Sequence, residues 1–226
     1  MTLAGVITAP RATLASVAME PRWAGVLILS FVVTTVCSAA LLHTDVGRLA
    51  LLDQLDRSAA AFGQNVDDAQ YTAMEEASEQ GTAWAVVGSL ASGPLLTFAL
   101  AAILFATFRT ALRGAGYRQV LAIVAHAGVI LAVRQVIVTP VNYARESLAS
   151  PITMSVFLSM LDEASPVARF FGILDLFVLW WLAVLAIGMS VLTGRPTRTL
   201  LVTFVGAYIV LALLIVTAMA VTGGTA

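Results

Sequence analysis

The sequence predicts an all-α, polytopic integral membrane protein with five transmembrane helices and a short extracytoplasmic helical hairpin. Composition is the first observation that leads to this fold class. Hydrophobic residues make up 60% of the 226-residue chain and charged residues only 11%, whereas soluble domains have about 45–50% and about 25%. The mean hydropathy is +0.95. Too little polar surface is present to cover a protein of this size in water, so lipid is the expected solvent.

The second observation is that five apolar stretches are long enough to cross a bilayer, which takes about 20 helical residues. We expect spans at about residues 23–42, 82–108, 119–140, 169–192 and 199–221. Two of these stretches contain an ionisable group at depth, Arg134 in the third and Asp175 in the fourth. The pieces between the spans are short, so residues 1–226 are expected to form a single membrane domain.

A cleaved signal peptide is the alternative interpretation of the first apolar stretch. Residues 37–39, Cys-Ser-Ala, loosely resemble a small-residue cleavage site. The apolar run is longer than a usual signal core and begins only at Trp23. We therefore predict that this stretch stays in the protein as its first span.

Arginine counts predict the orientation, because basic residues collect on the cytoplasmic side of a membrane. With the N-terminus inside, seven arginines face the cytoplasm against one acid, Glu20: Arg11, Arg22, Arg109, Arg113, Arg118, Arg195 and Arg198. The opposite side has eleven acids and four arginines: Arg48, Arg57, Arg145 and Arg169. The prediction is a cytoplasmic N-terminus and an extracytoplasmic C-terminus.

Before the first span, residues 10–20 predict a short helix. Pro10 is favourable in a first helical turn, and Pro21 ends the helix. The apolar side chains of Leu14, Val17 and Ala18 are expected to lie on the inner membrane surface. Such a helix would serve as an interfacial anchor or as a docking element for a partner.

Residues 44–81 form the largest polar piece and predict a helical hairpin outside the membrane. Thr44 is suited to cap its first helix. The apolar residues of that helix are spaced by three and four: Leu52, Leu55, Ala59 and Phe62. Gly63 is expected to end this helix, and Asn65 to cap the second one.

The same hairpin carries most of its charge as carboxylates. Asp53 and Arg57 are four residues apart and are expected to pair on one helix face. Five further acids follow: Asp67, Asp68, Glu75, Glu76 and Glu79. They lack the spacing of a calcium-binding loop, and acids on helices usually face water. We therefore predict no metal site.

Arg134 and Asp175 are the most informative polar residues, because an ionisable group in hydrocarbon costs about 2.5–3.5 kcal/mol. Each lies six residues from the expected outer end of its span, which is about 9 Å of depth at the helical rise. Because consecutive spans are usually neighbours, the two are predicted to form an intramembrane ion pair. The pair would hold two helices together, or it would belong to a proton or substrate site.

Further polar residues lie on the third span. His126 is deeper than Arg134 and would relay protons or hydrogen-bond across a helix interface. Gln135 and Asn142 lie near the outer end. These three residues would form a polar site, or, in the interpretation that we favour, they hydrogen-bond between helices.

No constellation points to an enzyme. Ser92-Gly93 together with His126 resembles an intramembrane serine protease only superficially, because Leu90 replaces the required first glycine and Pro94 bends the helix. No zinc-binding or phosphate-loop motif is present in the sequence. A net charge of −1 with scattered arginines excludes a nucleic-acid footprint. We predict no catalysis and no cofactor.

Three stretches carry a family resemblance: residues 9–13 (Ala-Pro-Arg-Ala-Thr), 20–23 (Glu-Pro-Arg-Trp) and 114–122 (Gly-Ala-Gly-Tyr-Arg-Gln-Val-Leu-Ala). With the five-span layout, they resemble bacterial members of the Yip1 family. The resemblance implies a five-helix membrane protein with a cytosolic N-terminus. It also implies relatives in eukaryotes that associate with prenylated Rab-type GTPases and act in vesicle traffic.

These features lead to two functional hypotheses. The first is a non-enzymatic protein that organises membrane lipids or a protein partner from the membrane or the cytoplasm. The partner could be a second copy of the chain, as a homo-oligomer. Arg109, Arg113 and Arg118 would be its cytoplasmic contacts. The alternative is a small transporter, or a subunit of one, that uses Arg134, Asp175 and His126. The expected location is the bacterial inner membrane.

Overall fold

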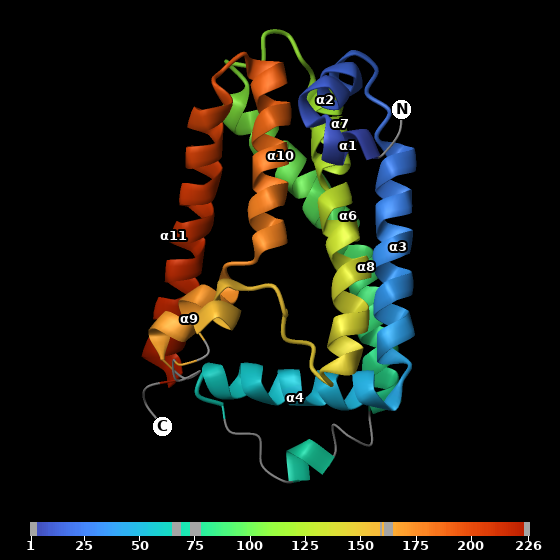
Figure 1. Ribbon diagram of the computed structural model, residues 1–226, viewed down its shortest axis with the longest axis vertical. Coiled ribbons are helices and arrows are strands. Elements are labelled where there is room, and N and C mark those ends of the chain that lie inside the picture. The colour runs from blue at the N-terminus through green and yellow to red at the C-terminus, as the bar shows by residue number, and fades with distance from the viewer. Residues whose placement is uncertain (1–3, 65–68, 73–77, 159, 161–164, 224–226) are drawn as a thin grey trace. The chain divides into compact units, whose positions relative to one another are not determined.

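The computed structural model describes residues 4–64, 69–72, 78–158, 160 and 165–223, whose regular structure is helical apart from one isolated β-bridge between Thr153 and Asp175. Figure 1 shows the order of the elements, coloured from blue at the N-terminal end to red at the C-terminal end. The elements are α1 (Ala4–Thr8), α2 (Pro10–Met19), α3 (Ala24–Leu42), α4 (Asp45–Ala61), α6 (Ser78–Phe108), α7 (Tyr117–Ala127), α8 (Val129–Ala144), the 3₁₀ helix η1 (Met154–Leu158), α9 (Pro166–Ile173), α10 (Leu176–Thr193) and α11 (Thr197–Gly223).

Five helical stretches of the described chain are long and apolar enough to cross a membrane. They are Ala24–Leu42, Val86–Phe108, Tyr117–Ala144, Leu176–Thr193 and Thr197–Thr222. The predicted all-α, five-span fold is therefore confirmed. The third stretch differs in detail because α7 ends at Ala127 and α8 starts at Val129, with Gly128 between them. It also continues through Pro140 to Ala144, beyond the expected end.

The fourth stretch differs more, because residues 169–192 belong to two helices. Between α9 and α10, Leu174 has an extended backbone and Asp175 follows it, so Asp175 precedes α10 instead of lying inside a helix. The Tyr208 hydroxyl donates to the carbonyl of Ile173 and accepts from the amide of Asp175. The neighbouring amides of Met154 and Leu176 donate to Leu174 and Ile152 respectively. These bonds satisfy the backbone where the helix is interrupted.

Two compact units make up the chain. The first consists of Met1–Thr35, Ser89–Gln135 and Phe177–Ala207, and the second of Val36–Gly88, Val136–Leu176 and Tyr208–Ala226. The connections between α2 and α3, between α6 and α7 and between α10 and α11 therefore fall in the first unit, and the region expected to be an extracytoplasmic hairpin falls in the second.

Helix α7 is the centre of the first unit. Every residue from Val120 to Ala127 is buried, and a helix that is buried on all sides belongs to a core. Helices α1 and α2 pack against each other, and α2 packs on α7 (Figure 1). Val6, Leu14 and Val17 have no exposed surface. The expectation that Leu14 and Val17 rest on the membrane surface is therefore wrong, because both pack inside the protein.

Helix α10 approaches this core closely at Gly188. A Cβ atom at Gly188 would lie 2.3 Å from Cγ2 of Ile123 on α7 and 3.3 Å from Cδ1 of Leu14 on α2. Only a residue without a side chain allows this approach. The N-terminal helix is thus held between spans of the first unit, which fixes it to the bundle.

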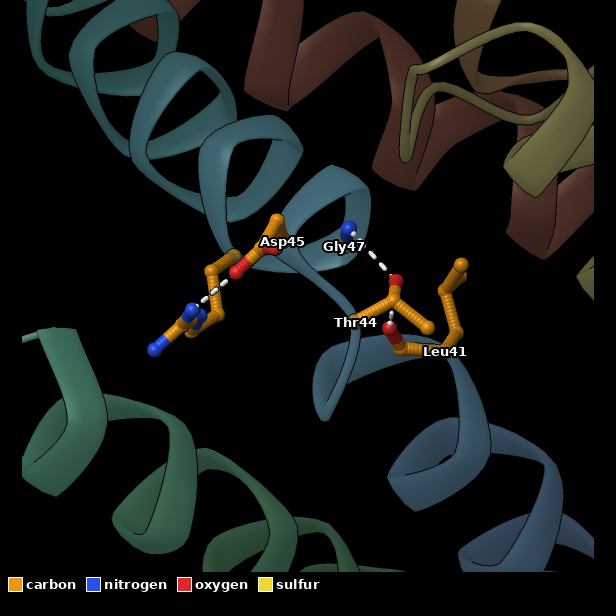
Figure 2. Close-up of polar contacts among 5 residues, drawn as sticks. Leu41, Thr44, Asp45 and Gly47 are labelled. Atoms are coloured by element: carbon orange, nitrogen blue, oxygen red, sulfur yellow. Dashed lines mark hydrogen bonds and ion pairs between the residues drawn. The ribbon is translucent and has the colours of Figure 1, made fainter.

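The second unit begins with a capped turn between α3 and α4, shown in Figure 2. Thr44 accepts a hydrogen bond from the Gly47 amide at 3.0 Å and donates one to the Leu41 carbonyl at 2.6 Å. Asp45 and Arg48 pair on the outer face of α4. The predicted Thr44 cap is confirmed, and it satisfies one of the amides that a helix start leaves without a partner.

Helix α4 also follows the sequence in its charges and its end. Arg57 and Asp53 form an ion pair at 2.6 Å. Gly63 has a φ of +72°, the left-handed conformation that ends helices. The expected Asn65 cap and the acids Asp67, Asp68, Glu75 and Glu76 lie outside the described residues.

Candidate functional site

The first unit presents five arginines on two connections and the helix starts that follow them. Arg109, Arg113 and Arg118 come from the connection between α6 and α7 and from the first turn of α7. Arg195 and Arg198 come from the connection between α10 and α11. All five are exposed, and neither stretch, 109–118 or 194–198, contains an acidic residue. We call these five residues the arginine face.

Close contacts hold the two connections together. Gly194 has a φ of +68°, and a Cβ atom there would lie 2.3 Å from Cζ of Arg113. The Arg113 guanidinium therefore rests directly on Gly194. The Arg195 guanidinium carbon lies 5.6 Å from the centre of the Phe108 ring, within range of a cation–π contact. The Ser190 hydroxyl fixes the Arg195 carbonyl at 2.7 Å.

The start of α7 is ordered in the same way. The Gly116 amide donates to Oε1 of Gln119 at 2.9 Å, and the Tyr117 hydroxyl donates to the Phe98 carbonyl at 3.1 Å. Arg118 is therefore held on a well-formed first turn. Three members of the arginine face, Arg109, Arg113 and Arg118, were predicted from the sequence as cytoplasmic contacts. Arg195 and Arg198 were predicted only to lie on the cytoplasmic side.

The same unit contains an apolar cavity of about 410 Å³ between α3, α6, α7, α8 and α10. Arg134 and Gln135 line it, together with Gly128 at the break in the third span and with Trp181 of α10. Thr97 also lines it, but its hydroxyl donates to the carbonyl of Gly93 on its own helix. Arg134 is thus placed against a cavity among four of the spans.

His126 is buried but does not line this cavity in the part of the chain that the structure describes. Its Nδ1 lies 2.8 Å from the carbonyl oxygen of Ala122, one turn earlier on α7. A side chain that bonds its own helix satisfies one ring nitrogen locally. The arrangement agrees better with a core histidine than with a relay.

Asp175 and Asn142 belong to the second unit. Asp175 is 4% exposed, and its Oδ2 accepts a hydrogen bond from the Ser150 hydroxyl at 2.9 Å. Asn142 is 7% exposed, and no described residue bonds its Oδ1. Arg134 belongs to the first unit, and its ion pair with Asp175 stays a prediction.

Metal binding has no support in the described residues, because they contain no group of three or more His, Cys, Asp or Glu that could hold an ion. Cys37 is a free thiol that is half-buried on α3.

Comparison with known proteins gives one result. The family model described as the Yip1 domain matches residues 4–219, which is nearly the whole chain. No curated protein and no solved structure matches this chain.

Proposed function

Because this chain belongs to the Yip1 family, we propose that it is a non-enzymatic integral membrane protein that organises partner proteins or lipids through its arginine face. The observation that carries the proposal is the grouping of five exposed arginines on two adjoining connections with no acid between them. Surfaces of one charge attract partners of the other. The expected partner surface is acidic.

The predicted location of this face supports a role inside the cell. The positive-inside rule predicts that both connections are cytoplasmic. The N-terminal helix α2 belongs to the same unit and packs on α7, whose first turn carries Arg118. Its exposed residues, among them the basic Arg11 and the apolar Met19, extend the surface available to a partner.

Charge reversal tests the proposal. The triple substitution Arg109→Glu, Arg113→Glu and Arg118→Glu is expected to reduce the partner recovered with the protein to background, because it turns attraction into repulsion. Recovery is measured by mass spectrometry of gently solubilised native membranes, with proteins and lipids quantified against the unchanged chain. The matched control replaces the same three residues by lysine, which keeps the charge and should retain the partner. Equal recovery with the glutamate variant would contradict the proposal.

A small transporter is the second candidate, and the cavity lined by Arg134 and Gln135 favours it. The apolar walls and the single guanidinium suit an anionic amphiphile. In this alternative, Arg134, Asp175 and His126 would line a pathway. A stable variant with Arg134 and Asp175 exchanged would then lose transport, whereas a structural pair would keep function.

A further inference from the structure

A second cavity, of about 610 Å³, lies in the second unit and gathers three arginines from distant parts of the chain. Arg57 comes from α4, Arg145 follows the end of α8, and Arg169 comes from α9. They are three of the four arginines that the sequence predicts outside the cytoplasm. None of the described residues that line the cavity is acidic.

Of the three guanidiniums, only Arg57 forms an ion pair with a described residue, and Asp175 places a second carboxylate beside the cavity wall through its bond to Ser150. Asp53 pairs with Arg57 at 2.6 Å and neutralises one of the three. Arg169 is half-buried and Arg145 is exposed. Like charges around one cavity repel one another, and walls of lower polarity strengthen the field inside it. An anion in the cavity would relieve this repulsion.

Hydroxyl groups add hydrogen-bonding capacity on the same walls. Ser147 accepts a bond from the Ala149 amide at 3.2 Å, which leaves its own O–H to donate. The hydroxyl oxygens of Thr153 and Ser155 lie 2.8 Å apart, and the Thr153 hydroxyl also lies 3.5 Å from the Ser150 carbonyl oxygen, so these two hydroxyls are largely used within the wall. Ser150 is already used, because it donates to Asp175.

The end of α8 fixes Arg145 and Ser147 beside the cavity. Glu146 adopts the left-handed φ of +51°, which is uncommon for a residue other than glycine. The amides of Glu146 and Ser147 bond the carbonyls of Tyr143 and Asn142 at 3.2 Å each. This pattern is a Schellman motif, which closes a helix with defined geometry. The two cavity residues therefore come from an ordered turn.

The chemistry of these walls identifies a class of ligand. Guanidinium groups match the geometry of phosphate oxygens and bind them through paired hydrogen bonds. The volume lies within the about 300–1,000 Å³ of small-molecule sites. Val156 and Leu158 provide an apolar wall beside the polar one. We propose that this cavity binds a ligand through its phosphate group, on Arg57, Arg145 and Arg169.

Calorimetric titration of the purified full-length chain in a neutral detergent tests the proposal. The two probes are inorganic pyrophosphate and dihexanoyl phosphatidic acid, and saturable binding of at least one is expected. Tighter binding of phosphatidic acid would assign the phosphate to a lipid headgroup, and tighter binding of pyrophosphate to a soluble ligand. The absence of saturable binding for both probes would overturn the proposal.

Substitutions locate the binding. Arg145→Gln and Arg169→Gln are each expected to weaken the tighter probe at least about tenfold, as the loss of a charged hydrogen bond does. Arg48→Gln is the matched control, because Arg48 lies on the same helix as Arg57, pairs with Asp45 and does not line the cavity. An equal loss in Arg48→Gln, or unchanged affinity in both cavity variants, would overturn the assignment. Melting curves of all variants verify that they fold, and Arg145→Lys keeps the charge if the glutamine variant unfolds.

Discussion

Replacing Gly47 by alanine is expected to destabilise the turn between α3 and α4 by at least about 3 kcal/mol, the upper end of the usual range for overpacking. The new Cβ would lie 2.0 Å from the carbonyl oxygen of Leu41 and 2.6 Å from its carbonyl carbon. Both obstacles are backbone atoms, so no side-chain rotation relieves the contact. Moving α4 away from the end of α3 would break the hydrogen bond from the Thr44 hydroxyl to the Leu41 carbonyl, which Figure 2 shows. Thermal unfolding in detergent, followed by tryptophan fluorescence, measures the loss.

Gly88→Ala is the matched control for this prediction. Gly88 lies within α6 and belongs to the same unit, and apart from its own stretch of helix no described atom lies within 4 Å of the position of its Cβ. Alanine is favoured over glycine in a helix by about 1 kcal/mol, so this variant should melt at the same temperature or higher. A Gly47→Ala variant that melts like the unchanged chain would contradict the close approach of α4 to the end of α3.

Exchanging the charges of Arg134 and Asp175 is also expected to change the stability of the protein strongly. On the prediction that the two residues pair, the single variants Arg134→Asp and Asp175→Arg are each expected to lose about 3–5 kcal/mol of stability, because each would bring two charges of the same sign together. The double variant should recover at least half of the summed loss, since it restores opposite charges. The measurement is the melting temperature of each purified variant.

Whether the losses of stability from the two substitutions add up shows whether the two residues interact. Strictly additive losses would mean that Arg134 and Asp175 do not interact, and would contradict the predicted pair. A double variant that is stable but inactive in the cell would favour the transport pathway. The hydrogen bond from Ser150 to Asp175 supports the carboxylate in either case. Ser150→Ala is therefore a useful background, because it weakens that support without changing charge.

The sequence predicts those features that depend on local interactions. Apolar stretches of sufficient length predicted the five spans. The Thr44 cap, the ion pair between Asp53 and Arg57 and the helix end at Gly63 involve residues at most four positions apart or a single backbone conformation. Local chemistry determines such features, so one sequence is enough to recognise them.

The features that the sequence analysis missed depend on distant partners. Leu14 and Val17 are apolar in a short helix, which fits a membrane surface as well as a core, and their burial depends on α7 more than a hundred residues later. The helix break before Asp175 is stabilised by Tyr208, 33 residues along the chain. Neither contact can be predicted from local hydropathy.

The candidate sites also differ in whether they depend on neighbouring or on distant residues. Arg109, Arg113 and Arg118 lie close together in sequence and were predicted as cytoplasmic contacts, whereas the contact of Arg113 with Gly194 depends on the fold. Arg57, Arg145 and Arg169 were only counted for orientation, because their grouping around one cavity depends on the placement of three elements. The positions of arginines in the sequence predict on which side of the membrane a loop lies, but they do not predict a binding site.

The most direct test of the account is the side of the membrane on which the arginine face lies. In a Cys37→Ser background, single cysteines are introduced by Thr110→Cys beside the arginine face and by Gln54→Cys on α4, both at exposed positions. A membrane-impermeant maleimide is applied to intact bacterial cells and to inverted membrane vesicles. Gln54→Cys is expected to be labelled in cells, and Thr110→Cys only in inverted vesicles. Labelling of Thr110→Cys in intact cells would place the arginine face outside and contradict a cytoplasmic partner.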